Sequence, residues 1–334
     1  MKHLAYLISC ITLFVSCMTS SEIQSVSLEK KNTIMKLSDS IYLSGQVNCI
    51  ESSKGYTYIS DLYGGLYSLN EGMVLSKKLS DIGNGKSELS FPDRLYVDNK
   101  NTVTIYDGNK KRYLYFTENG YVRQDSCSIS DVRIAGSCRF FCLGDTVYSS
   151  ITHDKHTVAL TRNGKLISKM FPLAKGMDDI RRPIDSQRHL LWTGESILLV
   201  GRCLLPYIQE YTKEGELASD FDLREVDILR GIYKNKKPDK PNSTFVVTRD
   251  ACYSNGNIYL LVSSDTKPYR CNTIVVLHKY GYGMKHIATF TLDKKMYSTF
   301  CVTDDNKLMA VNSHNSSVEI YEIPNINVAE FEYE

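Results

Sequence analysis

The residues best suited to chemistry in this 334-residue chain are polar side chains at the ends of short, apolar, β-like runs or in the connections between them. Carboxylate, imidazole and guanidinium groups together supply hydrogen-bond acceptors and donors for a polar ligand. If the runs are strands with a common orientation, their ends meet at one rim, where ligands usually bind. The candidate ligand-binding residues are Asp61, Arg94, Asp107, His153, Arg181, Arg182 and Arg202.

Familiar catalytic motifs are missing from the sequence. Gly-x-Ser-x-Gly and His-Glu-x-x-His do not occur, and the stretch 83–87 lacks the first glycine of a phosphate loop. Cys138 and Cys142 have neither a second cysteine pair nor a nearby histidine pair to complete a zinc pattern. We therefore expect no catalytic residue, no metal and no cofactor. The alternative is a metal-dependent hydrolase or lyase, although Arg202 at the rim would repel a cation.

The charge balance excludes some classes of protein. The chain has 40 Lys and Arg against 38 Asp and Glu, a net charge of +2, so a strongly basic nucleic-acid binder is excluded. Hydrophobic residues at 42% and charged residues at 23% are typical of a globular protein that can bury a core. The 23 tyrosines and 8 prolines favour β structure.

The first residues have the pattern of an export signal. Lys2 and His3 precede an uncharged apolar run, 4–15, that is too short to span a membrane comfortably. Ser16-Cys17 at its end resembles the lipobox of bacterial lipoproteins, which implies cleavage before Cys17 and lipidation of that residue. We expect a signal peptide over 1–16 and a lipid-tethered linker over 17–32. An ordinary cleaved signal with a chance cysteine is the alternative.

Eight further cysteines are scattered over the chain rather than grouped. Most lie in apolar runs, where a free cysteine behaves as a small buried hydrophobe. We therefore expect buried thiols rather than a disulfide scaffold, even in an oxidising compartment. They are Cys49, Cys127, Cys138, Cys142, Cys203, Cys252, Cys271 and Cys301.

An internal repeat predicts the fold. The run 56–61 ends in Asp61 and the following run ends in Gly72, and the same pair recurs as Asp107 and Gly120. Later copies of the glycine turn are Gly164, Gly215 and Gly281. Four strands in roughly 45 to 60 residues is the period of a β-propeller blade. A β-sandwich gives no reason for the glycine turn to recur at one phase.

Counting second strands predicts an all-β, six-bladed propeller with four-stranded blades over residues 33–324, followed by an acidic tail over 325–334. The expected second strands begin near Tyr56, Val103, Val147, Ile197, Ile258 and Leu308. The last blade has only three strands, so we expect an N-terminal strand, 33–37 or 41–43, to complete it and close the ring.

The loop 82–92 carries Gly83, Gly85, Glu88 and Pro92 in a pattern that resembles the TolB-like six-bladed propeller lipoproteins of Bacteroidetes. The resemblance is good over 46–126 and beyond residue 230 depends on the repeat alone. It implies an envelope lipoprotein, facing the periplasm or the cell surface, with no agreed catalytic residues.

The expected function is a non-enzymatic binding or scaffold module for a polar ligand or envelope partner. It would contact the membrane through its N-terminal lipid and bind a glycan, a peptide or an envelope protein, but no nucleic acid. The alternative enzyme would be of the six-bladed lactonase or amidating-lyase type. A basic insertion, 234–240, could touch anionic surfaces, but such runs are more often exposed loops.

Overall fold

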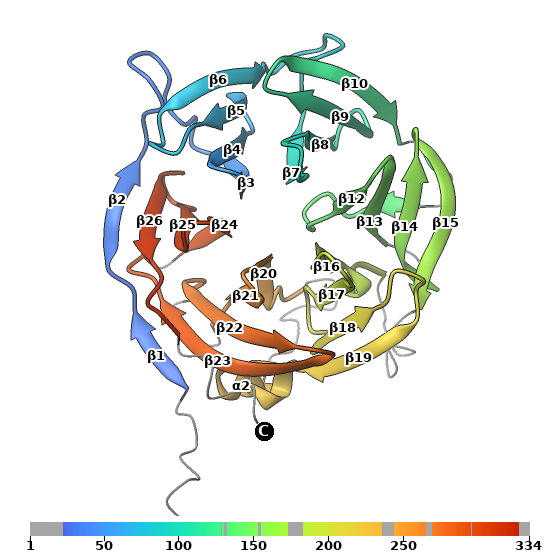
Figure 1. The fold of residues 1–334 in the computed structure, drawn as a ribbon, viewed down its shortest axis with the longest axis vertical. Coiled ribbons are helices and arrows are strands. Elements are labelled where there is room, and N and C mark those ends of the chain that lie inside the picture. The colour runs from blue at the N-terminus through green and yellow to red at the C-terminus, as the bar shows by residue number, and fades with distance from the viewer. Residues whose placement is uncertain are drawn as a thin grey trace, which may run out of the picture.

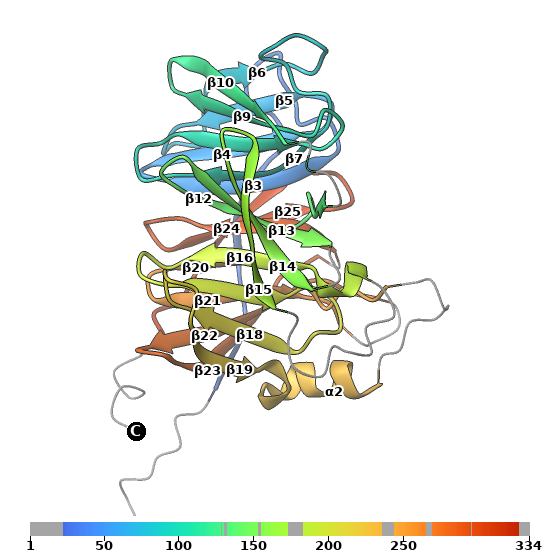
Figure 2. The ribbon, with the colours of Figure 1, turned by 90° about the vertical axis from the view of Figure 1, so that its right-hand side faces the viewer.

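Six β-sheets are arranged as blades around a central axis (Figure 1). The structure, a computed structural model, describes residues 23–127, 129, 132–152, 155–172, 183–235, 244–264, 269–294 and 296–326. Consecutive antiparallel strands build each blade from the axis outwards, which makes the predicted six-bladed propeller correct. Seen from the side, the blades form one thick disc (Figure 2).

The first three blades follow one another along the chain. In each, the innermost strand comes first and the outermost last. Blade 1 comprises β3 (Val47–Ser53), β4 (Tyr56–Asp61), β5 (Gly65–Leu69) and β6 (Leu75–Ser80). Blade 2 comprises β7 (Pro92–Val97), β8 (Val103–Asp107), β9 (Arg112–Thr117) and β10 (Gly120–Ser126). Blade 3 comprises β12 (Phe141–Leu143), β13 (Thr146–Thr152), β14 (His156–Arg162) and β15 (Lys165–Pro172), with the short β11 (Arg133–Ile134) also pairing β13.

The last three blades add the N-terminal strands. Blade 4 comprises β16 (Arg188–Trp192), β17 (Ile197–Gly201), β18 (Tyr207–Tyr211) and β19 (Leu217–Asp222). Blade 5 comprises β20 (Thr248–Ser254), β21 (Asn257–Val262), β22 (Thr273–Tyr280) and β23 (Gly283–Thr291), with β1 (Gln24–Ser27) outside it. Blade 6 comprises β24 (Tyr297–Val302), β25 (Lys307–Asn312), β26 (Val318–Glu322) and β2 (Lys30–Ile34).

The predicted second strands agree closely with the structure. β4, β8 and β17 begin at Tyr56, Val103 and Ile197, as the repeat predicts, and the other three begin one residue earlier than predicted. The sequence repeat predicted these starts correctly because second strands are buried on both faces and therefore appear as uninterrupted apolar runs. The outermost strands β10 and β19 have only half-buried and exposed positions and give weaker signals.

The ring closes through an N-terminal strand, as predicted, but with different residues. β2 pairs antiparallel with β26, so that Lys30 faces Tyr321 and Ile34 faces Val318. The alternative segment, 41–43, instead forms a small hairpin through a bridge between Lys36 and Tyr42. β1 was not predicted, and it adds a parallel fifth strand to blade 5. Both N-terminal strands begin before residue 33, inside the range expected to be linker.

The core lies between blades, and the glycine turns join the outer strands. Buried residues of neighbouring blades pack together, for example Tyr259 of blade 5 with Phe300 of blade 6. Gly120, Gly164, Gly215 and Gly281 all have positive φ, as the turn pattern predicts. In blade 1 the positive φ falls on Met73 rather than on Gly72.

One α-helix and two short 3-10 helices, η1 (Pro183–Ser186) and η2 (Leu223–Glu225), interrupt the β structure of the described chain. After η2, helix α2 (Asp227–Asn235) buries Leu229 and Ile232 against blades 4 and 5. Residues 236–243, which include most of the basic insertion, lie outside the described residues. Within the described chain we find no helix with both the length and the apolarity that crossing a bilayer requires.

Candidate functional site

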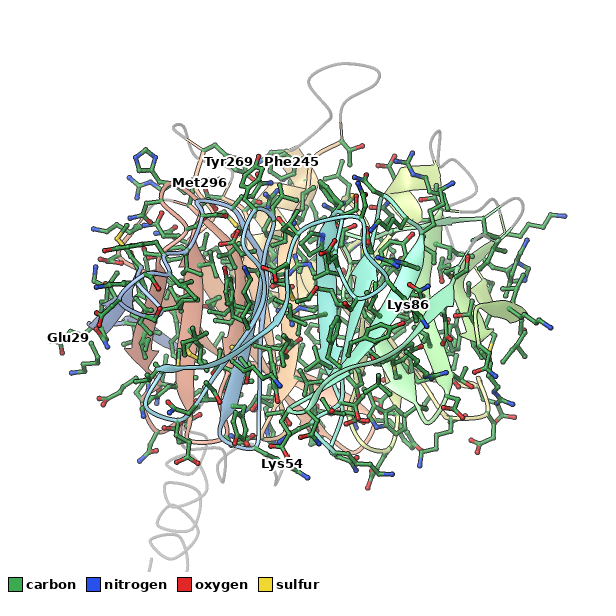
Figure 3. All side chains as sticks on the ribbon, turned by 90° about the horizontal axis from the view of Figure 1, so that it is seen from above. Glu29, Lys54, Lys86, Phe245, Tyr269 and Met296 are labelled. Carbon is green, nitrogen blue, oxygen red and sulfur yellow. The ribbon has the colours of Figure 1, made fainter. Side chains whose placement is uncertain are left out.

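A polar cavity of about 150 Å³ opens on the propeller axis. It lies at the face where the innermost strands begin, the face that carries Met296, and Lys54 lies on the opposite face (Figure 3). We call this cavity the axial mouth. All six blades contribute to it, and its lining residues are Val47, Asn48, Asp93, Arg94, Gly136, Ser137, Arg202, Arg249 and Ser298.

Bulges in the innermost strands place side chains in the axial mouth. In β3 and β7 the pairing register shifts between Val47 and Cys49 and between Pro92 and Leu95, which leaves one extra residue on the inner strand each time. The same shift occurs at the second residue of β20 and β24. A bulge takes a residue out of the ladder and redirects its side chain. The bulged residues are Asn48, Asp93 or Arg94, Arg249 and Ser298, and all of them line the mouth.

A buried ionic network lies beneath the mouth, and we call it the floor. The fully buried Asp250 carboxylate accepts two hydrogen bonds of 2.7 Å from Arg139 and one of 3.0 Å from Arg94. Thr299 donates to it at 2.6 Å and the Phe300 N–H at 3.1 Å. Arg139 also forms an ion pair with Glu51. These residues come from five blades, so the floor ties the propeller together at its axis.

The charges of the floor stabilise one another. Burial by itself raises the pKa of Asp250, but the charges of Arg139 and Arg94 outweigh it and hold that pKa well below the usual range. Burial lowers the pKa of His189 to about 3, helped by Arg94 and Arg202. Neutral His189 accepts the Arg139 N–H at Nδ1 over 3.2 Å, and its Nε2 lies 3.3 Å from the Thr248 carbonyl oxygen. His189 is therefore neutral, and both of its ring nitrogens are occupied by contacts within the floor.

The groups above the floor are less satisfied. Arg202 donates from Nη1 to Gln187 at 2.9 Å, but its buried Nε has no partner among the described residues. Within the same residues, the Arg249 guanidinium and the Asp93 carboxylate make no hydrogen bond or ion pair. Burial raises the pKa of Asp93 to about 6, opposed by Arg94 and assisted by Asp107. The mouth thus presents both donors and acceptors without partners.

The structure brings Arg94 and Arg202 of the predicted site together in the mouth. Asp61 and Asp107 are fully buried instead, and both organise backbone. Asp107 accepts from the N–H groups of Ser90 and Phe91 at 3.0 and 3.1 Å. Asp61 accepts from those of Ser44, Tyr63 and Gly64. The remaining predicted residues, Cys17, His153, Arg181 and Arg182, lie outside the described residues.

Four residues of the mouth were not predicted as site residues: Asn48, Asp93, Arg249 and Ser298. Each is a polar residue at the second position of an innermost strand, next to apolar or network residues. A polar residue recurring at that position in four blades was the available signal. It was hidden because a bulge breaks the period-2 alternation by which strand faces are assigned.

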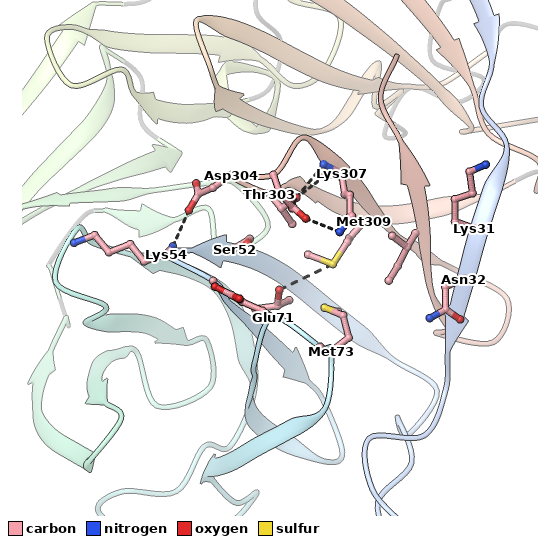
Figure 4. A pocket seen from close by; sticks show the side chains of 15 residues that line it. Lys31, Asn32, Ser52, Lys54, Glu71, Met73, Thr303, Asp304, Lys307 and Met309 are labelled. Atoms are coloured by element: carbon pink, nitrogen blue, oxygen red, sulfur yellow. Dashed lines mark hydrogen bonds and ion pairs between the residues drawn. The ribbon is translucent and has the colours of Figure 1, made fainter. Parts of the chain in front are cut away.

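Two larger hollows lie on the opposite face, between neighbouring blades. One, of about 760 Å³, lies where blade 6 meets blade 1 (Figure 4). Some of its charged groups are paired, Lys307 with Asp305 at 2.5 Å and the Asp304 carboxylate with the Lys54 N–H at 2.9 Å, whereas the Glu71 carboxylate has no hydrogen bond or ion pair within the described residues. The other, of about 430 Å³, has the buried Glu210 paired with Lys279 at 3.0 Å. Each of these hollows is lined by two neighbouring blades, whereas all six blades contribute to the axial mouth, which makes the mouth the stronger candidate.

The eight cysteines of the propeller confirm the expectation of free thiols. All eight are unpaired, and seven are buried. Among the described residues, no three His, Cys, Asp or Glu side chains come together as a metal would require. Guanidinium groups dominate the mouth, so its chemistry suits an anionic group better than a cation.

The comparisons with known proteins concern the fold. No protein-family model matches the chain, and no curated protein matches it. A protein from Bacteroides fragilis NCTC 9343 that is named as exported superposes with a TM-score of 0.58 at 14% identity, over 90% of this chain and 99% of its own. A β-propeller domain of Cps50 (Swd1) from Myceliophteria thermophila gives 0.54 at 12% identity, over 88% and 99%. A streptogramin B lyase gives 0.50 at 13%, over 90% and 97%. At these identities, the likeness establishes a β-propeller fold.

Proposed function

We propose that this protein is an exported, lipid-anchored β-propeller that binds a polar, anionic ligand in the axial mouth without transforming it. One observation carries the proposal. The mouth holds two guanidinium groups with unfilled donors, those of Arg202 and Arg249, above a floor whose own charges are fully paired. The buried Arg202 Nε is costly without a partner, and a bound anion would satisfy it together with the donors of the half-buried Arg249.

The ligand-binding part is tested by a thermal-shift screen of the mature protein. The screen would contain organic acids, amino acids, acidic sugars and neutral sugars at millimolar concentration. We expect stabilisation by one anionic class, because a ligand that binds only the folded state raises its apparent stability. The stabilisation should disappear in Arg249→Gln but persist in Arg270→Gln, where the exposed Arg270 is a matched arginine outside the cavity. Equal stabilisation of both variants would contradict a site in the mouth.

The anchoring part depends on the sequence pattern around Cys17 and on the exported neighbour of similar fold. We expect cells expressing the full chain to incorporate labelled palmitate into the protein, and Cys17→Ala to lose both the label and membrane association. A Cys10→Ala control should keep both. Unlabelled protein in the wild type would refute the lipid anchor without affecting the binding proposal.

A further inference from the structure

We infer that the axial mouth recognises a small carboxylate that also carries a hydrogen-bond donor, either an ammonium or a hydroxyl group. The inference depends on the proposed binding function at the same mouth, and it names the class of ligand. Free amino acids and hydroxy acids belong to this class, as do longer molecules that end in such a group.

The side of the mouth that carries Arg202 and Arg249 suits an anionic group of the ligand. The Arg249 guanidinium has five N–H donors and, among the described residues, no acceptor for them. Arg202 adds a buried Nε in the same condition. A carboxylate offers two oxygens that match the planar fork of a guanidinium, and each such bond to a charged group is stronger than a neutral one.

The Asp93 side of the mouth suits a ligand group that donates a hydrogen bond. Its carboxylate projects from the bulge of β7 and has no hydrogen-bond donor within the described chain. Gly108 and Gly136 flank it, and a side chain at either glycine would collide with its Oδ2. An ionised carboxylate accepts hydrogen bonds and cannot donate them. A ligand that brought only acceptor oxygens would leave Asp93 unsatisfied and would be repelled by it.

The charge count favours a ligand with no more than one net negative charge. The floor uses Arg94 and Arg139 against Asp250 and Glu51, two cations against two anions. Above it stand Arg202 and Arg249 against Asp93, which leaves one positive charge in excess. A zwitterion or a hydroxy acid places its carboxylate on the arginines and its donor on Asp93. A dianion such as sulfate would reverse the excess charge and would offer Asp93 no donor.

The size of the cavity limits the recognised group to a few atoms. An engineered apolar cavity of similar volume holds a benzene molecule, roughly six heavy atoms. The axial mouth, at about 150 Å³, therefore suits a group of the size of alanine or lactate. Anything larger must keep its remaining atoms above the mouth.

The first experiment is isothermal titration calorimetry on the mature protein at pH 7.5. The probes are L-alanine, D-alanine, β-alanine and lactate, and the comparison compounds are propionate, ethanolamine and sulfate. We expect an alanine or lactate probe to bind at least tenfold more tightly than propionate, ethanolamine or sulfate. Equal binding of propionate would overturn this inference and leave the anion-binding mouth intact. No binding of any anionic probe would overturn this inference, and failure of the thermal-shift screen as well would overturn the proposed function.

The second experiment uses variants that separate the two halves of the site. Asp93→Asn should reduce alanine binding to the level of propionate while leaving propionate binding unchanged or stronger. Arg249→Gln should weaken alanine and propionate alike. Asp39→Asn and Arg270→Gln, at exposed positions outside the cavity, are the matched controls and should change neither. If Asp93→Asn leaves the ratio of alanine to propionate affinity unchanged, Asp93 does not select the donor and the inference is wrong.

Discussion

Replacing Asp250 by asparagine tests whether the floor holds the propeller together. Asparagine keeps the shape of the side chain but removes the negative charge that Arg94 and Arg139 share. Two buried guanidinium groups then remain against Glu51 alone. Breaking a buried ionic network by removing one partner costs about 3–5 kcal/mol of stability. For a domain of roughly 300 residues, we expect Tm to fall by about 5–8 °C.

The assay is urea unfolding followed by circular dichroism and by the fluorescence of Trp192, the one tryptophan of the chain. Thr299→Val is the comparison, because it removes the hydrogen bond to Asp250 and the acceptor of one from Arg94 but no charge, and it should therefore cost less than Asp250→Asn. In the pair Asp250→Asn with Arg139→Met, the loss should be smaller than the sum of the single losses by at least about 1 kcal/mol. An Asp250→Asn variant within about 1 kcal/mol of the wild type would refute the reasoning.

The pH dependence of that loss follows from the sign of the pKa shift. The folded-state pKa of Asp250 is depressed, so its contribution to stability is complete above the unfolded pKa near 3.8. It is lost only as the pH falls through the still lower folded value. The difference between wild type and Asp250→Asn should therefore be constant from about pH 5 to pH 8. A difference that grows or vanishes within this window would mean that another group controls the floor.

Three further predictions concern the mouth, one turn and the ring closure. The pKa of Asp93 is raised from 3.8 to about 6, so the ionised side chain lowers the stability of the protein above pH 6 and has no such effect below about pH 4. Asp93→Asn should therefore stabilise the protein at pH 8 by about 1–3 kcal/mol in urea unfolding. The gain should be absent at pH 4. Gly164→Ala should lower Tm more than Gly144→Ala, since both have positive φ but only the Gly164 side chain would collide with the Ser126 carbonyl; equal losses would refute the role of the collision. Deleting residues 1–34 should expose the edge of β26 and cause oligomers in size-exclusion chromatography. Deleting residues 1–27 removes only β1, leaves the ring closed and should give monomers. Monomers after both deletions would contradict closure of the ring by β2.

The fold could be predicted because its signal is repeated. Second strands such as β8 and β17 are buried throughout, and the glycine turns recur at one phase. The closing strand β2 was harder to locate because its exposed positions, Lys31 to Thr33, interrupt any apolar run. β1 pairs in parallel along the outside of blade 5 and has no period of its own to detect.

The site was less predictable than the fold for a physical reason. Asp61 and Asp107 look like rim ligands in the sequence, but a short acidic side chain at a strand end equally well accepts hydrogen bonds from the turn that follows it. The structure shows that second use for Asp61, which accepts from Tyr63 and Gly64. It also shows it for Asp107, which accepts from the Lys110 N–H at 3.3 Å in addition to the earlier loop. Arg94 and Arg202, predicted from their places in a loop between blades and at a second-strand end, do line the mouth.

The bulges join the architecture of the propeller to its chemistry. An inner strand without a bulge would direct alternate side chains into the gaps between blades, where apolar packing and the Asp250 network are needed. One extra residue per strand, as at Asn48 and Arg249, gives a side chain that belongs to neither neighbouring blade and faces the axis. The identity of that residue can change without disturbing the ladder or the floor. The mouth can therefore hold unsatisfied groups such as Asp93 and Arg249, because the fully paired floor beneath it supplies the rigidity that a preorganised binding site requires.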